Sequence, residues 1–261
     1  MLMKLTLPDK SIRDLKNGST GFDLANDIGP GLAKAAVAVT VDGVQKDLHD
    51  PIMHDANISI ITIDSEEGLE IMRHTLAAQV LARAVKNLYP KSKLAIGPTI
   101  KDGFYYDVEC KETISIDDLK KIEKEMDKIV KTKSSITKKL LSKKDALKVF
   151  KDKDESYKEE IINDSDQEDE FQLYYHDDED FVDLCKGPHL PNLNFIGAYK
   201  LTTISGAYWK GDSSNTMLTR IYGTAWSNEK DLNEHLNSIE EAQKRDHRKL
   251  GKEMDLFHFQ D

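Results

Sequence analysis

The stretch that decides the fold of the N-terminal region is AVAVTVDGVQKDL, residues 36–48. Two β-prone runs flank Asp42-Gly43, a dipeptide whose residues both accept the positive φ angles of a type I′ turn. The stretch therefore predicts a β-hairpin. Before the hairpin, Met3–Leu7 alternates apolar and polar residues like a strand. After it, Asn57–Ile63 is a further strand that is rich in β-branched residues.

A short helix is predicted between the first strands and the hairpin. The first strand ends in a turn at residues 8–10. Thr20 is a good N-cap residue, and Asp23 follows three positions later, which is the pattern of a capping box. The run at 29–31, Gly-Pro-Gly, is expected to end this helix. Two strands, a helix, a hairpin and a final strand predict a ubiquitin-like β-grasp domain over residues 1–63.

The remaining residues predict an α+β domain at 64–226 and a connector helix at 227–261. A long amphipathic helix begins at residue 64 or 65, and a second begins near Ser115. Residues 173–226 alternate β-type runs with glycine turns. The last helix carries only a thin apolar stripe, which is typical of a connector.

The composition indicates a two-domain protein without a membrane segment. The 261 residues are 39% hydrophobic, which is enough for two modest cores. No apolar run approaches the roughly 20 residues of a membrane-spanning helix, and the N-terminus lacks a signal peptide. The two cysteines, Cys110 and Cys185, show no paired spacing, which favours free thiols and a cytoplasmic location.

The net charge of −10 is unevenly distributed. Residues 120–153 are rich in lysine, and residues 154–183 are rich in aspartate and glutamate. A basic block can contact phosphates in an acidic protein. Two solvated faces of opposite charge are the plainer interpretation of charge alone.

Three short segments carry residue types that suit chemistry: RHT at 73–75, SYK at 156–158 and DLCKGPH at 183–189. In the third, a glycine and a proline exclude a regular helix, so its cysteine and histidine are expected on a turn. Such a pair is compatible with half of a metal site, with a thiol–imidazole pair or with coincidence. The residues alone leave these alternatives open.

Longer segments give the chain a family resemblance. They are AIGPTIKDGFYYDV at 95–108, DLCKGPH at 183–189, GAYWKGDSSNTMLTRIYGTAW at 206–226 and KRDHRKLGKEMDLFHF at 244–259. In this order and spacing they resemble bacterial threonyl-tRNA synthetases. Alanyl-tRNA synthetases have a similar editing fold and Cys/His turn but not the surrounding sequences. The resemblance implies that the first domain is a TGS domain and that residues 64–226 form a tRNA editing domain.

The resemblance also implies a set of site residues. Cys185 and His189 match the family's cysteine and histidine, Asp183 its preceding acid, Lys158 its active-site lysine, and His74 the first histidine of a His-x-x-x-His helix. Sites of this kind hydrolyse the ester of serine wrongly attached to threonine tRNA. On this interpretation His74 and His189 handle protons, Lys158 faces the carbonyl oxygen, and Cys185 orients substrate or water.

Two adjacent tyrosines are further candidates for substrate binding. Tyr105 and Tyr106 are candidates to stack on the terminal adenosine of the tRNA or to line the pocket. Packing in the core of a strand is the alternative for both.

One position departs from the family's pattern. Four residues after His74 the chain has Ala78, and the next polar residue is Gln79. Counted back from the end of the helix, Thr75 and Gln79 occupy the two histidine positions. Residues five apart lie about 140° apart around a regular α-helix. We therefore predict a single-turn π-bulge that keeps His74 inward and makes Gln79 a substitute hydrogen-bond partner; the alternative is that His74 leaves the site.

The expected function is that of the N-terminal part of a threonine–tRNA ligase. It comprises hydrolysis of Ser-tRNA(Thr) and binding of the tRNA acceptor end, with a class II core expected beyond Asp261. No cofactor, metal or membrane is expected for these residues. The family's ATP, zinc and homodimer contacts belong to that core. A non-catalytic tRNA-binding appendage is the first alternative, and a metal-dependent hydrolase with His74, Cys185 and His189 as ligands is the second.

Overall fold

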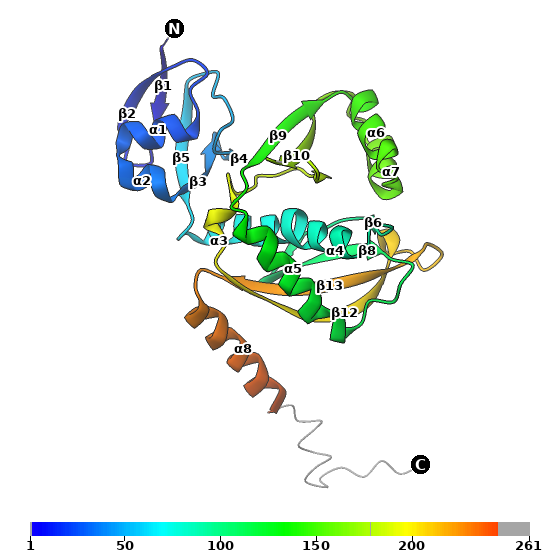
Figure 1. The fold of residues 1–261 in the computed structure, drawn as a ribbon. Helices are drawn as coiled ribbons and strands as arrows, with labels where there is room; N and C mark the ends of the chain where they lie inside the picture. Colours follow the sequence, from blue (N-terminus) through cyan, green and yellow to red (C-terminus); the bar gives the residue numbers. More distant parts are fainter. Residues whose placement is uncertain (1, 178, 245–261) are drawn as a thin grey trace, which may run out of the picture.

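The computed structural model describes residues 2–177 and 179–244, which form two domains and a final helix (Figure 1). The rest of the predicted connector, including most of the segment quoted at 244–259, lies outside the described residues. The first domain consists of β1 (Leu2–Thr6), β2 (Ile12–Lys16), α1 (Gly21–Ile28), α2 (Pro30–Ala35), β3 (Ala36–Val41), β4 (Val44–Asp47) and β5 (Ala56–Thr62).

The first domain is the predicted β-grasp fold. Its sheet has the order β2-β1-β5-β3-β4, with β1 parallel to β5 and the other neighbours antiparallel. The hairpin turns at Asp42 and Gly43, with φ angles of 49° and 84°, as a type I′ turn requires. Thr20 and Asp23 form the predicted capping box of α1. The predicted turn and the predicted capping box are therefore both confirmed.

Residues 29–31 end the first helix as predicted, and they also begin a second helix that was not predicted. Gly29 ends α1 through its N–H, which donates to the Ala25 carbonyl, but Pro30 begins a second helix at once. Proline is well tolerated at the first position of a helix, because its N–H would have no intrahelical partner there. The Gly-Pro-Gly run is therefore the junction between two consecutive helices.

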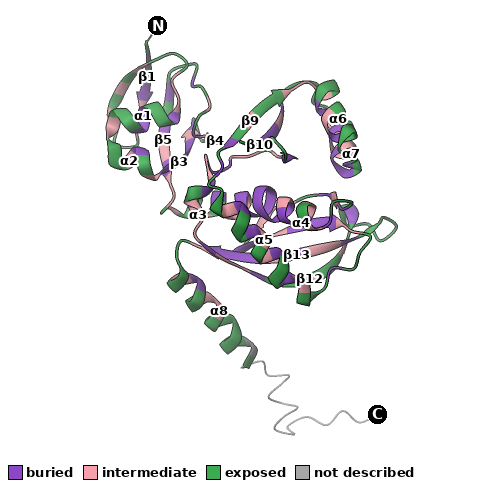
Figure 2. Ribbon diagram, in the orientation of Figure 1, coloured by how far each residue is buried: buried purple, intermediate pink, exposed green. Residues whose placement is uncertain are grey.

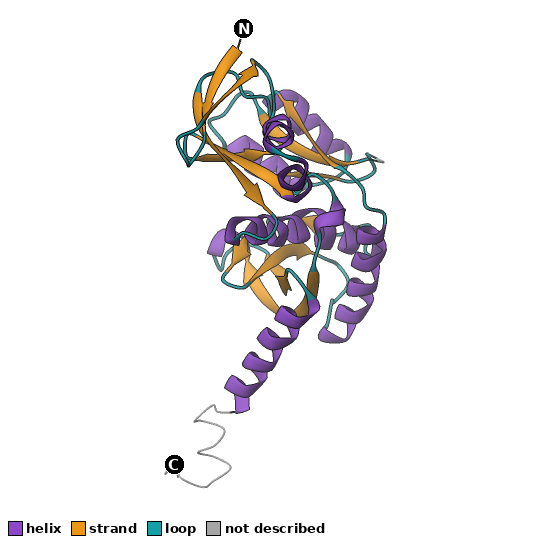
Figure 3. Ribbon diagram, turned by 90° about the vertical axis from the view of Figure 1, so that its left-hand side faces the viewer, coloured by secondary structure: helices purple, strands orange, loops and turns teal. Residues whose placement is uncertain are grey.

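The second domain contains two sheets separated by a long helix, which Figures 1 and 3 show from two sides. The larger sheet has the order β12-β13-β8-β6, with β7 also paired to β8, and the smaller has the order β11-β10-β9. Its elements are α3 (Glu66–Thr75), a π-helical turn (Leu76–Leu81), α4 (Ala82–Leu88), β6 (Lys93–Leu94), β7 (Thr99–Ile100), β8 (Gly103–Glu109), α5 (Leu119–Lys131), β9 (Ile136–Leu141), α6 (Lys143–Asp152), α7 (Ser156–Asp164), β10 (Phe171–His176), β11 (Val182–Leu184), β12 (Ala198–Tyr208) and β13 (Met217–Trp226).

The core of this domain lies where the long helix, residues 66–88, and α5 pack against the larger sheet. The long helix is the most continuously buried element in Figure 2. The apolar stripe of α5 is buried in full and consists of Leu119, Ile122, Met126 and Ile129. The predicted α+β class is therefore confirmed.

The predicted π-bulge is also present. Residues Leu76–Leu81 form a π-helical turn between α3 and α4, and each of the six is buried. The chain passes from Glu66 to Leu88 without a break at this turn. The extra residue is thus absorbed inside the helix, which is the first of the two alternatives given by the sequence.

The last described helix, α8 (Glu229–Lys244), follows the larger sheet and carries mostly exposed side chains (Figure 2). Over residues 2–177 and 179–244, no helix combines the length and the apolar character needed to cross a membrane.

The start of α3 provides a test of the junction between the domains. A methyl group on Gly68 would overlap the main-chain carbonyl of Thr62, which cannot move without displacing β5. We expect Gly68→Ala to lower the free energy of unfolding by about 2–3 kcal/mol, measured by urea denaturation. Gly31→Ala is the control, because no atom lies within 4 Å of its added methyl group. A Gly68→Ala protein as stable as the control would contradict this packing.

Candidate active site

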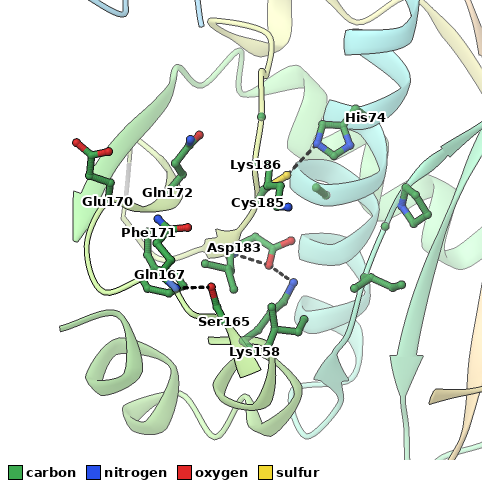
Figure 4. A pocket seen from close by; sticks show the side chains of 17 residues that line it. His74, Lys158, Ser165, Gln167, Glu170, Phe171, Gln172, Asp183, Cys185 and Lys186 are labelled. Atoms are coloured by element: carbon green, nitrogen blue, oxygen red, sulfur yellow. Dashed lines mark hydrogen bonds and ion pairs between the residues drawn. The ribbon is translucent and has the colours of Figure 1, made fainter. Parts of the chain in front are cut away.

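A cavity of about 480 Å³ opens between the long helix and the strand β11 (Figure 4). His74 and Ala78 line it from the helix, Lys158 from α7, and Asp183 and Cys185 from β11 and the turn that follows. The three segments singled out in the sequence therefore meet at one cavity, although they are far apart in the chain.

A buried ion pair lies at the inner end of this cavity (Figure 4). Lys158 and Asp183 are 2% and 1% exposed, and Nζ of Lys158 lies 2.5 Å from Oδ1 of Asp183. The Tyr106 hydroxyl donates to Oδ2 of Asp183 at 2.9 Å and accepts from Nζ of Lys158 at 3.1 Å. Burial and the neighbouring Asp183 carboxylate raise the pKa of Tyr106 well above its usual value, so it stays a neutral donor. An ammonium group has three N–H donors, so one remains for a ligand in the cavity.

A thiol and two imidazoles form the opposite side of the site. Nε2 of His74 lies 2.8 Å from Sγ of Cys185. The rings of His74 and His189 stack with their centroids 4.6 Å apart and their planes within 5°. Burial lowers the pKa of both imidazoles, and the Asp183 carboxylate partly offsets this for His74. The neutral form of each ring is therefore favoured near neutral pH.

Thr75 fixes the tautomer of His189. Its hydroxyl donates to the Ile71 carbonyl at 2.8 Å, so toward other groups it can only accept. It accepts from the main-chain N–H of Leu190 at 3.0 Å and lies 3.2 Å from Nδ1 of His189. Nδ1 therefore carries the proton, and Nε2 of His189 keeps its lone pair, without a hydrogen-bond partner among the described residues. From the sequence, Thr75 was predicted only to occupy one of the family's two histidine positions in an alternative register of the helix.

Asp47 is a site residue that the sequence did not reveal. It ends β4 in the first domain, and its Oδ1 accepts from the main-chain N–H of His189 at 2.8 Å. Its Oδ2 accepts from the Tyr174 hydroxyl at 2.7 Å and lies 2.8 Å from Nζ of Lys138. The Tyr174 ring meets the His189 ring edge-on, with centroids 4.4 Å apart. These partners are far from Asp47 in the chain, so no local pattern signals the contact.

The DLCKGPH turn depends on one glycine. Gly187 has a φ of 65°, which a residue with a Cβ rarely adopts. A methyl group there would also overlap the Tyr174 hydroxyl. The glycine thus lets the turn pass over Tyr174 and bring Cys185 to the cavity.

The two predicted substrate-binding tyrosines do not line the cavity. Adjacent strand residues point to opposite faces of a sheet. Tyr106 points toward the helix layer and is 0% exposed, so its ring has no free face for a base. Tyr105 points the other way, where it packs under the guanidinium of Arg220 and beside Tyr222. The core alternative describes Tyr106, whose hydroxyl contacts Asp183 and Lys158.

The structure also differs from the prediction for Gln79. Ala78, not Gln79, lines the cavity. The Gln79 side chain is completely buried, and neither of its amide atoms has a hydrogen-bond partner among the described residues. Its main-chain carbonyl lies 3.0 Å from Nε2 of His176. The π-helical turn thus keeps His74 inward without bringing Gln79 to a contact with it.

Three side chains could together hold a metal ion. The ligand atoms of His74, Cys185 and His189 all lie within 4.8 Å of one another. Nitrogen and sulfur ligands of one tetrahedral zinc ion lie about 3.6 Å apart, from bond lengths of about 2.0 and 2.3 Å. The 2.8 Å contact between His74 and Cys185 is shorter, so this pair as it stands fits a direct contact better than shared coordination.

Two family models match the chain. They are the TGS domain at residues 3–62 and the threonyl and alanyl tRNA synthetase second additional domain at residues 172–222. The chain is 48% identical, over 98% of its length, to a threonine–tRNA ligase from Prochlorococcus marinus (strain MIT 9211). It is 48% identical, over 100% of its length, to one from Francisella philomiragia, and 49% identical, over 98%, to one from Hahella chejuensis. It spans about 40% of the length of each of these relatives. The chain belongs to the threonine–tRNA ligase family and corresponds to the part of it that contains the TGS and second additional domains.

Proposed function

We propose that these two domains bind the acceptor end of threonine tRNA and hydrolyse serine wrongly attached to it. The observation that carries the proposal is the cavity itself, which combines a buried ammonium group on Lys158 with a neutral imidazole on His74. An ester hydrolase needs a group that stabilises the oxyanion and a group that takes a proton from water. Membership of the threonine–tRNA ligase family supports the choice of substrate.

A hydrolytic site is useful because binding alone discriminates poorly between serine and threonine. Serine differs from threonine by one methyl group, and a difference of this size provides only about 1–3 kcal/mol of discrimination in one binding pocket. A second site that hydrolyses the smaller product multiplies the selectivity of the first.

We assign the proton acceptor to His74 rather than to His189. His74 lines the cavity, whereas His189 is 2% exposed and stacks behind it. In the proposed reaction water displaces the Cys185 thiol from Nε2 of His74 and attacks the ester carbonyl carbon while that nitrogen accepts its proton. The bond from that carbon to the ribose oxygen then breaks, and the ribose oxygen takes the proton from His74. The products are free serine and uncharged tRNA.

Lys158 and Cys185 have supporting parts in this reaction. The remaining N–H of Lys158 donates to the carbonyl oxygen as negative charge develops there. Asp183 holds the ammonium group in place through their 2.5 Å contact. Cys185 contacts Nε2 of His74, and we assign it the orientation of that nitrogen rather than a nucleophilic role.

The central test uses the 261-residue protein without ATP. We expect Ser-tRNA(Thr) to be hydrolysed about 10–200-fold faster than Thr-tRNA(Thr), the range set by one methyl group. His74→Ala should slow the reaction on Ser-tRNA(Thr) by about 10²–10⁴-fold, as expected for loss of a general base. His54→Ala is the control, because this histidine is exposed on the first domain and pairs only with Asp42. A wild-type rate no higher than the uncatalysed rate would favour the non-catalytic tRNA-binding alternative.

The lowered pKa of His74 predicts the pH dependence of this rate. Its usual value is 6.5, and burial moves it downward, so the imidazole is neutral above pH 6.5 and becomes protonated only at a lower pH. We expect kcat/KM to be flat from about pH 7 to 8 and to fall on an acid limb whose midpoint lies below about 6.5. The contribution of the buried neutral His74 ring to the free energy of unfolding is likewise fully present above pH 6.5. It is lost as the pH falls through the lowered pKa of His74. An acid limb centred above 7 would contradict the assignment.

We further propose that hydrolysis needs no metal ion, because His74 and Cys185 are closer together than two ligands of one zinc ion. Elemental analysis of the purified protein should find far less than one zinc per chain, and incubation with a chelator should leave the deacylation rate unchanged. One zinc per chain, lost in Cys185→Ala, would support the metal-dependent alternative. The ATP, zinc and homodimer contacts expected for an aminoacylating core, and the cytoplasmic location, remain predictions.

A further inference from the structure

A second cavity, of about 520 Å³, lies at the junction of the two domains beside the first. On one side it is lined by β4 and the turn after it, and on the other by β9, β10 and the segment that contains Lys186. Four residues line both cavities: Gln167, Glu170, Gln172 and Lys186. The two spaces are thus neighbours that share a wall (Figure 4 shows these four residues around the first cavity).

This neighbourhood matters for a nucleic-acid substrate. The terminal adenosine and its aminoacyl group would occupy the first cavity, and the strand that carries them is covalently continuous. The nucleotides before the adenosine must therefore lie in a space that adjoins the first cavity. The second cavity is such a space.

The charges of the second cavity suit a phosphate backbone. Asp47 and Asp50 share one lysine, Lys138, whose Nζ lies 2.8 Å from the first carboxylate and 2.5 Å from the second. Lys46 and Lys186 line the same cavity and take part in no ion pair among the described residues. With Glu170 the lining holds three carboxylates and three lysines, and the two lysines that take part in no ion pair can bind phosphates as point charges.

The remaining lining suits unpaired bases. Val44 and Leu140 are 60% and 53% exposed, although both are apolar, and they approach the cavity from different domains. Apolar side chains of this kind can pack against the face of a base. Gln45 and Gln172 offer amide groups that both donate and accept, as the edges of a pyrimidine require.

We propose that the second cavity binds the single-stranded nucleotides that precede the terminal adenosine of the tRNA, so that the first domain supplies one side of the path of the 3′ end. This inference rests on the function proposed above. It assigns a direct RNA contact to β4, with Lys46 on a phosphate.

The test compares two ligands that cannot be hydrolysed. One is 3′-deoxy-3′-(serylamino)adenosine, which is long enough only for the first cavity. The other is the trinucleotide CCA that ends in the same adenosine, which reaches the second. By titration calorimetry we expect the trinucleotide to bind at least about 10-fold more tightly. Lys46→Ala should remove about 3–10-fold of this gain and lower the slope of log K against log salt by about 0.7, the value for one phosphate on a single strand.

Lys46→Ala should leave the affinity for the mononucleoside unchanged, because Lys46 does not line the first cavity. Lys34→Ala is the matched control, since this exposed lysine lies on α2 of the same domain and lines neither cavity. Lys46→Gln keeps most of the side chain and should match Lys46→Ala, which excludes a packing effect. If the mononucleoside binds but the trinucleotide gains nothing, or if Lys46→Ala acts no differently from Lys34→Ala, the inference is overturned while the proposed function stands. If the mononucleoside itself does not bind, the proposed function fails.

Discussion

The carboxylate of Asp47 holds together a site that two domains build. One oxygen accepts from the main-chain N–H of His189, and the other accepts from the Tyr174 hydroxyl beside a salt bridge to Lys138. Hydrogen bonds to a charged group are roughly twice as strong as neutral ones, and here one comes from the turn that carries Cys185 and His189 and the other from Tyr174 on β10. Any rotation of the first domain away from the second would break them. The position of the turn that carries Cys185 and His189 therefore depends directly on how the two domains pack together.

The second constraint is the ion pair between Lys158 and Asp183, which are almost completely buried. A buried pair of this kind is weak evidence for stability, because removing two charges from water costs several kcal/mol per ion and apolar residues of equal size often do as well. Its geometry does fix an ammonium group, with Tyr106 and the Leu184 N–H completing the contacts of the carboxylate. A preorganised cation at the end of a cavity is what a developing oxyanion requires. This geometry supports the role proposed above for Lys158.

Local signals in the sequence were sufficient for much of the fold. The Asp42-Gly43 turn and the Thr20 capping box depend only on residues next to them, and the π-helical turn followed from counting residues between His74 and the end of its helix. Asp47 could not be predicted, because its partners lie 127 and 142 residues away. The sequence left two alternatives for Tyr106, the pocket or the core, because it does not show which face of the strand is covered by helices. In both cases the missing information is tertiary.

The stacked rings of His74 and His189 are consistent with the proton-accepting role proposed for the altered helix. The π-helical turn leaves the methyl group of Ala78 at the cavity wall, so a single imidazole, that of His74, faces it. A positive charge on either stacked ring disfavours protonation of the other, and the His74 ring lowers the pKa of His189 in this way. The resting pair is therefore neutral. In the proposed reaction His74 takes a proton from water, and the nearby carboxylates of Asp183 and Asp47 would favour the imidazolium that forms, since both act to raise its pKa. Burial thus supplies a base that is free near neutral pH, and the two carboxylates, one from each domain, stabilise the charge that it acquires during the reaction.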